Sequence, residues 1–401
     1  TLLYYYRCWF LIQLKQTEKA LSALSTAEQQ APDCCFPNRL EAILALQSVI
    51  NQGMATPKAY YYLGNLWYDK RQYPEAIAAW EASAAQDKCF PTVLRNLSLA
   101  YFNKLNRQEE AVSLLEQAFA LDTTDARILM ELDQLYKRLN RPHTERLSFL
   151  DANREVAFSR DDLYLEYVTL LNHLGRYEEA IQLIDARKFH PWEGGEGKVP
   201  AQYQLARVEL VKQHLAAKEY EKALPLIEEC FVYPHNFGEG KLRGAQENDF
   251  NYYKACVLEG LGRTGEALSL FEQAGTGNSQ PAAALYYNDQ KPDKIFYQGL
   301  ALLKLGRESE AYLCFNNLIS YGKTHLHDVF KMDYFAVSLP DLQIWEDDLT
   351  KKNRIHCNYL MGLGYLGMGN RTAAEAYFTA VTEEDNNHQG GQGEKATEVL
   401  I

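Results

Sequence analysis

The sequence has little positive charge and lacks long apolar runs. Its 401 residues include 41 Lys and Arg against 53 Asp and Glu, so the formal net charge is −12. Binding to a nucleic-acid backbone or to anionic lipid depends on clustered Lys and Arg. No run approaches the roughly 20 apolar residues that a membrane span needs. We therefore expect neither nucleic acid nor a membrane as a partner.

Metal and cofactor motifs are also missing. The eight cysteines form no C-x-x-C pair, and we interpret them as small buried side chains in a reducing, cytoplasmic compartment. His325 and His327 are two residues apart, which puts them on different sides of a helix. We expect no cofactor and no resident metal. The chain opens at Thr1 inside a helical pattern without a visible secretory signal, so we expect a piece of a longer polypeptide.

Apolar residues nevertheless make up 47% of the chain, and many of them recur in pairs. An alanine is followed four residues later by a large apolar residue at eight places: Ala20/Leu24, Ala76/Trp80, Ala111/Leu115, Ala180/Ile184, Ala223/Ile227, Ala267/Phe271, Ala311/Phe315 and Ala374/Phe378. In a helical hairpin, a small alanine lets the second helix approach the first. The large residue one turn later lies on the same face and fills the neighbouring groove. The pattern predicts stacked pairs of helices.

Turn signals precede these pairs. A glycine stands five residues before four of the alanines, at Gly175, Gly262, Gly306 and Gly369. Glycine permits the left-handed backbone that ends a helix. The widest gap holds two units if Glu145 takes the alanine place in a divergent repeat, with Phe149 after it. We count about nine hairpins of roughly 34 residues each.

This pattern resembles the tetratricopeptide repeat (TPR) family over nearly the whole chain. The best copy runs from Lys58 to Trp80, with Leu63, Gly64, Trp67 and Ala76 also at signature places. The resemblance implies an all-α fold, a right-handed TPR superhelix (α-solenoid) of about nine hairpins over residues 1–382. We expect insertions at 33–56, 188–200, 233–248, 276–292 and 321–352, the first with an extra helix. Residues 383–401 read as a polar, frayed C-terminal tail.

The resemblance also places a binding groove on the first helices. The fifth, ninth and twelfth residues of each unit would line it: Tyr5, Trp9, Tyr61, Asn65, Tyr68, Phe102, Tyr252, Phe296, Leu300, Leu303, Tyr359 and Leu363. These residues would form a continuous exposed apolar and aromatic stripe, larger than a monomer usually leaves open. A partner protein, a missing part of the polypeptide or the chain's own insertions would cover it. Tyr61 stands where the family's carboxylate clamp needs Lys, so we do not expect that activity.

Two loops repeat the tetrapeptide GEGK, at Gly195–Lys198 and Gly238–Lys241. Their candidate binding residues are His190, Trp192, Glu193, Glu196, Lys198, His235, Glu239 and Lys241. A phosphate-binding loop is excluded, because Ser or Thr should follow the GK pair and Val199 and Leu242 stand there. A structural loop, a recognition loop and a weaker metal site stay open.

The insertion at 321–352 is too apolar for a solvated loop. Its large apolar residues are Tyr334, Phe335, Val337, Leu339, Leu342, Ile344 and Trp345. They should pack on the solenoid or seat a neighbour. Glu346, Asp347 and Asp348 suit the start of the next helix, where the helix dipole favours acids.

A narrower resemblance concerns the phrases RKFHPWEGGEGKV, DYFAVSLPDL and NRIHCNYLMGLGYLG. They are similar to the C-terminal half of large bacterial proteins whose N-terminal part is a mutarotase-like β-sandwich. We interpret the chain as a docking scaffold that binds a partner protein or its own missing domains, and not as an enzyme by itself. The alternative is an accessory part of a carbohydrate-active enzyme, with carbohydrate bound through the parent protein. Homodimer formation is a third, weaker hypothesis.

Overall fold

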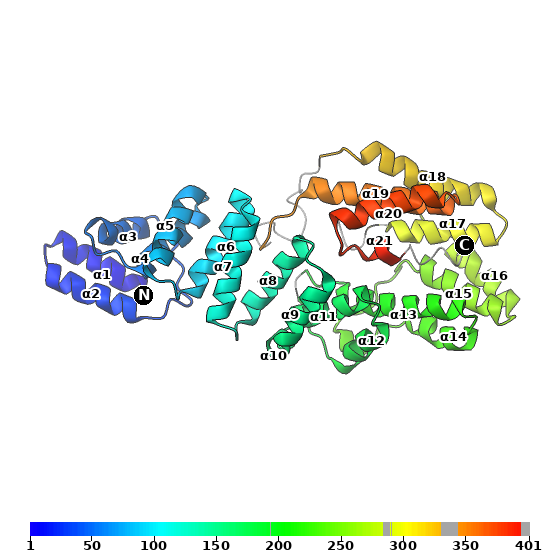
Figure 1. Cartoon of the computed structure of the whole chain (residues 1–401), viewed down its shortest axis with the longest axis horizontal. Coiled ribbons are helices and arrows are strands. Elements are labelled where there is room, and N and C mark those ends of the chain that lie inside the picture. Colours follow the sequence, from blue (N-terminus) through cyan, green and yellow to red (C-terminus); the bar gives the residue numbers. More distant parts are fainter. Residues whose placement is uncertain (193, 284–288, 290, 330–343, 394–401) are drawn as a thin grey trace. The chain divides into compact units, whose positions relative to one another are not determined.

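The computed structural model describes residues 1–192, 194–283, 289, 291–329 and 344–393. Within these ranges the regular structure is entirely helical, and no strand occurs among them. Figure 1 traces the helices in chain order. The prediction of an all-α fold is confirmed.

Successive helices pair as the alanine pattern predicts. Within the described ranges eight such pairs pack together: α1 (Leu2–Gln13) with α2 (Thr17–Gln29), α4 (Pro57–Asp69) with α5 (Tyr73–Gln86), α6 (Pro91–Leu105) with α7 (Gln108–Leu121), α11 (Asp161–His173) with α12 (Tyr177–Ala186), α13 (Lys198–Ala216) with α14 (Tyr220–Glu229), α15 (Asn248–Gly260) with α16 (Thr264–Ala274), α17 (Pro292–Lys304) with α18 (Glu308–His325), and α19 (Leu349–Gly367) with α20 (Arg371–Glu384). Helix α8 (Ala126–Arg138) is followed by α9 (His143–Ala152), and the rings of Tyr136 and Phe149 meet with centroids 5.5 Å apart. The other helices are α3 (Glu41–Asn51), α10 (Arg154–Ala157), the 3₁₀ turn η1 (His235–Phe237) and α21 (Gln389–Gly393). Helix α3 is the predicted extra helix, and it packs against α1 and α4.

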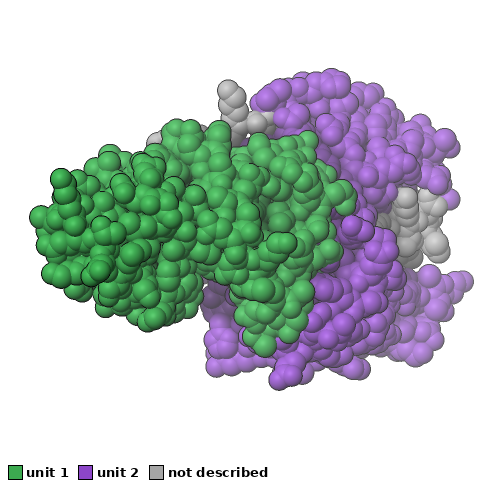
Figure 2. All heavy atoms as spheres, turned by 60° about the vertical axis from the view of Figure 1, so that its left-hand side comes forward, with its two compact units in different colours: residues 1–135, 344–346 green, residues 136–343, 347–401 purple. Residues whose placement is uncertain are grey.

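The chain forms two compact units, coloured separately in Figure 2. Unit 1 comprises residues 1–135 and 344–346. Unit 2 comprises residues 136–343 and 347–401. Unit 1 therefore includes three residues of the connection between α18 and α19.

The repeated residues occupy the interiors of the hairpins. All eight alanines are buried, and so are the eight large residues that follow them by four positions. The first helix of a pair must also carry a small residue where the large side chain of the second helix contacts it. A Cβ atom on Gly299 would lie 2.4 Å from the ring of Phe315, and Gly64 faces Trp80 at the same distance. Close packing of helix on helix thus explains both the alanine and the glycine positions.

The eight turns before these alanines share one backbone conformation. The residue five positions before each alanine has a left-handed φ. Four of them are the predicted glycines, with φ of 73–75°. The other four are Lys15, Arg71, Asn106 and Lys218, with φ of 53–59°. The sequence revealed this turn only where glycine occupies it.

In the divergent hairpin α8–α9, the predicted register is wrong by one residue, because Arg146 and not Glu145 occupies the alanine position. Glu145 is exposed, whereas Arg146 is buried. The Arg146 N–H donates to the Pro142 carbonyl, the bond that the alanine makes in other hairpins. Pro142 adds one residue to the turn, so Arg146 takes the alanine place. Buried Leu150 takes the place expected for Phe149.

Residues 383–393 are docked in unit 2, which corrects the expectation of a frayed tail for this part, and residues 394–401 lie outside the described residues. Asn387 accepts a hydrogen bond from the buried Arg146 guanidinium at 2.8 Å and donates to the Lys137 carbonyl at 3.1 Å. The Nδ2 of Asn386 donates to the Asn140 carbonyl at 2.9 Å. These amides satisfy the polar groups of the α8–α9 hairpin, as buried polar groups require. A polar sequence is ordered here by hydrogen bonds instead of apolar burial.

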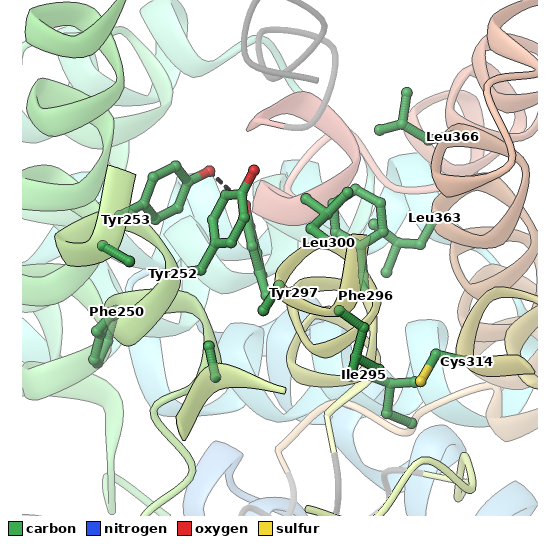
Figure 3. Close-up of a cluster of buried hydrophobic side chains, with 14 of the residues drawn as sticks. Phe250, Tyr252, Tyr253, Ile295, Phe296, Tyr297, Leu300, Cys314, Leu363 and Leu366 are labelled. Atoms are coloured by element: carbon green, nitrogen blue, oxygen red, sulfur yellow. Dashed lines mark hydrogen bonds between the residues drawn. The ribbon is translucent and has the colours of Figure 1, made fainter. Parts of the chain in front are cut away.

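The core of unit 2 continues from hairpin to hairpin. Figure 3 shows Tyr252 and Tyr253 of α15 beside Phe296 and Tyr297 of α17, with Leu363 of α19 farther along. The hydroxyls of Tyr253 and Tyr297 are hydrogen bonded at 2.6 Å. Buried tyrosines need such a partner for their hydroxyl. Neighbouring first helices therefore share one aromatic core.

Candidate functional site

The predicted groove residues lie on the first helices, but most of their rings are covered. The buried ones are Tyr5, Tyr61, Tyr252, Phe296 and Tyr359, together with Leu300 and Leu363. The half-buried ones are Trp9, Asn65, Tyr68, Phe102 and Leu303. The expected continuous exposed stripe is therefore wrong, because packing between neighbouring helices encloses the rings, as in Figure 3. Their role in binding stays a prediction.

One surface of unit 1 holds a segment of the chain itself, residues 344–346. Trp345 of this segment is fully buried, with 0% of its surface exposed. Its Nε1 donates to the main-chain oxygen of Glu131 at 3.1 Å. Its ring meets Phe102 edge-on, with centroids 5.1 Å apart and planes at 76°. We call Phe102, Asn103, Lys104 and Glu131, on α6 and α8, the tryptophan site.

This position confirms that part of the 321–352 insertion packs on the solenoid. Trp345 covers Phe102, one of the predicted groove residues. The insertion's residues Tyr334, Phe335, Val337, Leu339 and Leu342 lie outside the described residues. For Phe102, the cover is therefore the chain's own insertion, one of the three that the sequence left open.

Asn103 holds the main chain on both sides of Trp345. Its Nδ2 donates to the Ile344 carbonyl at 2.9 Å. Its Oδ1 accepts from the Glu346 N–H, also at 2.9 Å. One carboxamide thus satisfies a donor and an acceptor of the bound backbone, as a neighbouring strand would. We call these two hydrogen bonds of Asn103 to the main chain of residues 344 and 346 the Asn103 bracket. They do not depend on the side chains of the segment.

Charge pairing completes the tryptophan site. Lys104 forms an ion pair with Glu346 and lies 4.5 Å from the centre of the Tyr73 ring. Burial alone would lower the pKa of the Lys104 amine, but the hydrogen bond and charge of Glu346 raise it above its usual value. Burial raises the pKa of Tyr68 nearby.

The opposite wall of the site is fixed by buried charge. The Glu131 carboxylate is fully buried and accepts from Arg95 at 2.6 Å and from Arg127 at 2.9 Å. A buried carboxylate persists only with such partners. They hold α8, and with it the carbonyl that receives Trp345, in place.

The acids after Trp345 have separate partners. Asp348 caps α19, with its side chain accepting from the Lys351 N–H at 2.9 Å, which confirms the predicted helix start. Within unit 2, Asp347 pairs with Arg138 at 2.6 Å and with Lys352 at 2.5 Å. Burial would raise the pKa of Asp347, but these two cations lower it. Glu346 does not belong to the helix start and serves the tryptophan site instead.

An open hollow of about 470 Å³ lies next to Lys104. It is lined by Tyr73, Pro74, Ile77, Ala78, Glu81, Lys104 and Leu105. Its walls come from α5 and α6. The hollow extends the surface available beside the tryptophan site.

The two GEGK loops come together in unit 2. The Phe189 N–H donates to the Asn236 carbonyl at 2.8 Å, and the Gly197 N–H donates to Glu239 Oε2 at 2.9 Å. Gly238 has φ of 74°, and a Cβ there would lie 2.6 Å from the Phe189 carbonyl oxygen. The close approach explains why the second loop needs glycine at this place.

A hollow of about 250 Å³ forms between the paired loops. It is lined by His190, Pro191, Trp192, Gly195, Glu196, Val199, Phe237 and Glu239. Four predicted loop residues are therefore brought together: His190, Trp192, Glu196 and Glu239. Burial raises the pKa of the Glu239 carboxyl, and the charge of Glu196 adds to the rise.

The other predicted loop residues are directed elsewhere. Lys198 begins α13 and is exposed. Lys241 donates to the Phe231 carbonyl at 3.0 Å, and His235 is exposed in η1. Glu193 lies outside the described residues.

Among the described residues, no group of three or more His, Cys, Asp or Glu side chains could hold a metal ion. In the same part of the chain, no helix combines the length and apolar character needed to cross a membrane.

Sequence reasoning missed the polar half of the tryptophan site. Asn103, Lys104 and Glu131 carry no motif, and their distance from Trp345 in sequence exceeds 200 residues. The available signal was the apolar insertion itself, for which the sequence predicts packing on the solenoid or contact with a neighbouring protein. The sequence did not indicate which unit would provide that contact.

Comparisons with known proteins concern the fold alone. No protein-family model matches the chain. Similar solved structures include a tetratricopeptide repeat protein from Parabacteroides merdae (15% identity, 69% of this chain and 83% of that one, TM-score 0.31). Others are YrrB, described as a TPR protein with an unusual peptide-binding site (13%, 57% and 90%, TM-score 0.32), and Naa15/Naa10 bound to HypK-THB (11%, 99% and 64%, TM-score 0.41). Because the identities are below 25% and the TM-scores below 0.5, these similarities say nothing about the function of this chain.

Proposed function

We propose that the chain is a protein-binding scaffold that holds extended protein segments on the first helices of unit 1. The observation that carries the proposal is the Asn103 bracket, in which one side chain pairs with both main-chain neighbours of Trp345. Recognition of an extended backbone by paired hydrogen bonds, with a pocket for one side chain, is a general mode of peptide binding. The occupied surface belongs to α6 and α8, whose positions are set by the hairpin packing.

A displayed library of random peptides, panned on the Trp345→Ala chain, tests this proposal. That variant removes the occupant of the tryptophan site, and a circular dichroism melt checks that its hairpins stay folded. We expect enriched peptides whose binding is lost when Asn103→Ala is added, because the bracket disappears. Enrichment that Asn103→Ala leaves intact, or no enrichment, would contradict the proposal. A matched control is Asn106→Gly, which also removes a carboxamide near the end of α6 and suits the left-handed backbone of the turn.

A second candidate function concerns the paired loops of unit 2. Trp192 and the carboxylates of Glu196 and Glu239 line one hollow, and an aromatic face with carboxylates suits a sugar. The loops would then serve as an accessory carbohydrate site of a larger enzyme. Calorimetric titration of sugars into the longest form of the protein is expected to give binding that Trp192→Ala abolishes. Binding unchanged in that variant removes this candidate.

A further inference from the structure

We propose that the tryptophan site selects partner segments of the order aliphatic–Trp–acidic, and that residues 344–346 are the chain's own competing occupant. This inference rests on the proposed function and names its ligand class. The partner is a protein that exposes such a segment in an extended form. The bound segment Ile344–Glu346 provides the pattern of contacts from which the ligand is read.

The central requirement is tryptophan. Only an indole has both a large apolar face for Phe102 and an N–H that reaches the Glu131 carbonyl. Phenylalanine would keep the ring contact and lose the hydrogen bond. A net hydrogen bond of this kind corresponds to about 2- to 10-fold in affinity. Alanine at this position would lose the burial as well.

The flanking preferences follow from position and charge. The Asn103 bracket fixes which residue precedes and which follows the tryptophan, and so sets the direction of the segment. Lys104 is the cation beside the following residue and pairs with Glu346. The preceding place is taken by the half-buried Ile344.

The occupant is suited to exchange. It is a short segment without regular secondary structure, and the Glu346 side chain remains 55% exposed. A tethered segment competes at an effective concentration on the order of mM. A free ligand at micromolar concentration would therefore bind weakly until the tethered tryptophan is removed or displaced. The open hollow beyond Lys104 offers further contacts to a longer partner than residues 344–346 can use.

Fluorescence anisotropy with one defined probe tests this inference. The probe is a synthetic peptide with the sequence of residues 343–348, labelled with fluorescein at its N-terminus. It is titrated with the parent chain and with Trp345→Ala and Glu346→Arg variants of the same length. We expect at least about tenfold tighter binding to Trp345→Ala, and a smaller gain for Glu346→Arg, which weakens the occupant without opening a core. Circular dichroism melts establish whether each variant is folded. If Trp345→Ala does not fold, the comparison of Glu346→Arg with the parent chain still tests the inference.

Two further probes isolate the tryptophan. The peptide with Phe in place of Trp should bind the Trp345→Ala chain about 2- to 10-fold more weakly, and the peptide with Ala should not bind measurably. Equal probe binding by the parent chain and both folded variants would overturn the inference. So would a parent dimer that Trp345→Ala converts to a monomer by light scattering, because the occupant would then come from a second copy. If library panning succeeds with another motif while this probe fails, only the ligand class is wrong; if both fail, the proposed function also fails.

Discussion

The left-handed turn residues allow a direct test of the hairpin geometry. Lys218 has φ of 59° at the place where four other hairpins have glycine, and it is exposed. A left-handed backbone costs an ordinary residue about 1–2 kcal/mol, whereas glycine loses about 0.5–1 kcal/mol more backbone entropy than alanine. Lys218→Gly should therefore stabilise the fold by about 0.5–1 kcal/mol. With an unfolding entropy of about 2.1 cal/mol/K per residue, that corresponds to a rise in Tm of roughly 1 °C for a chain of this size.

Scanning calorimetry of the parent, Lys218→Gly and Lys218→Ala measures this effect. Lys218→Ala is the matched control, because it removes the same side chain and keeps the Cβ that causes the strain. Lys15→Gly provides the same comparison in unit 1, where φ is 55°. A lower Tm for Lys218→Gly than for Lys218→Ala would refute the reasoning, since glycine would then cost entropy without relieving strain.

Three further outcomes concern packing and charge. Ala267→Arg should destabilise the chain by at least about 1–3 kcal/mol by overpacking its hairpin, and a thermal melt that matches the parent would contradict the assigned register. Gly299→Ala should lower Tm because its Cβ would lie 2.4 Å from an aromatic ring, whereas Gly265→Ala, with open space around it, should leave Tm unchanged or raise it; the reverse order would disprove the packing. The cations Lys137 and Arg146 outweigh burial and hold the pKa of Glu166 below its ordinary value of 4.5. This ionised carboxylate therefore adds stability above pH 4.5 that is lost as the pH falls further. Urea melts of Glu166→Gln should show less pH dependence in that acidic range, and an identical pH profile would contradict the assignment.

Local packing rules made most of the fold predictable. Alanine and the large residue four positions later identify a helix pair because their sizes alone decide whether two helices can approach. The same rule failed at Arg146, where an ion pair and an amide replace the small side chain. The turns before the alanines were only partly predictable. The left-handed backbone can be expected from sequence where glycine stands, but not at Lys15, Arg71, Asn106 and Lys218.

The candidate sites were harder to predict because their parts are distant in sequence. The duplicated GEGK phrase indicated two unusual loops, and their pairing became visible only through Asn236 and Glu239. The repeat pattern predicts which face of a first helix carries the aromatic residues, but it does not predict how far neighbouring helices cover that face. Tyr252 and Phe296 have the expected positions but serve the shared core.

The docked asparagines have a consequence for how unit 2 is made. Helical repeats can stack one after another as a nascent chain leaves the ribosome. The α8–α9 hairpin obtains its contact from Asn387 only after about 240 further residues have been synthesised. The hydrogen bond of Arg146 to Glu166 needs only 20 further residues of chain. This hairpin is therefore made early and completed late, and synthesis interrupted before residue 387 would leave Arg146 without its hydrogen bond to Asn387.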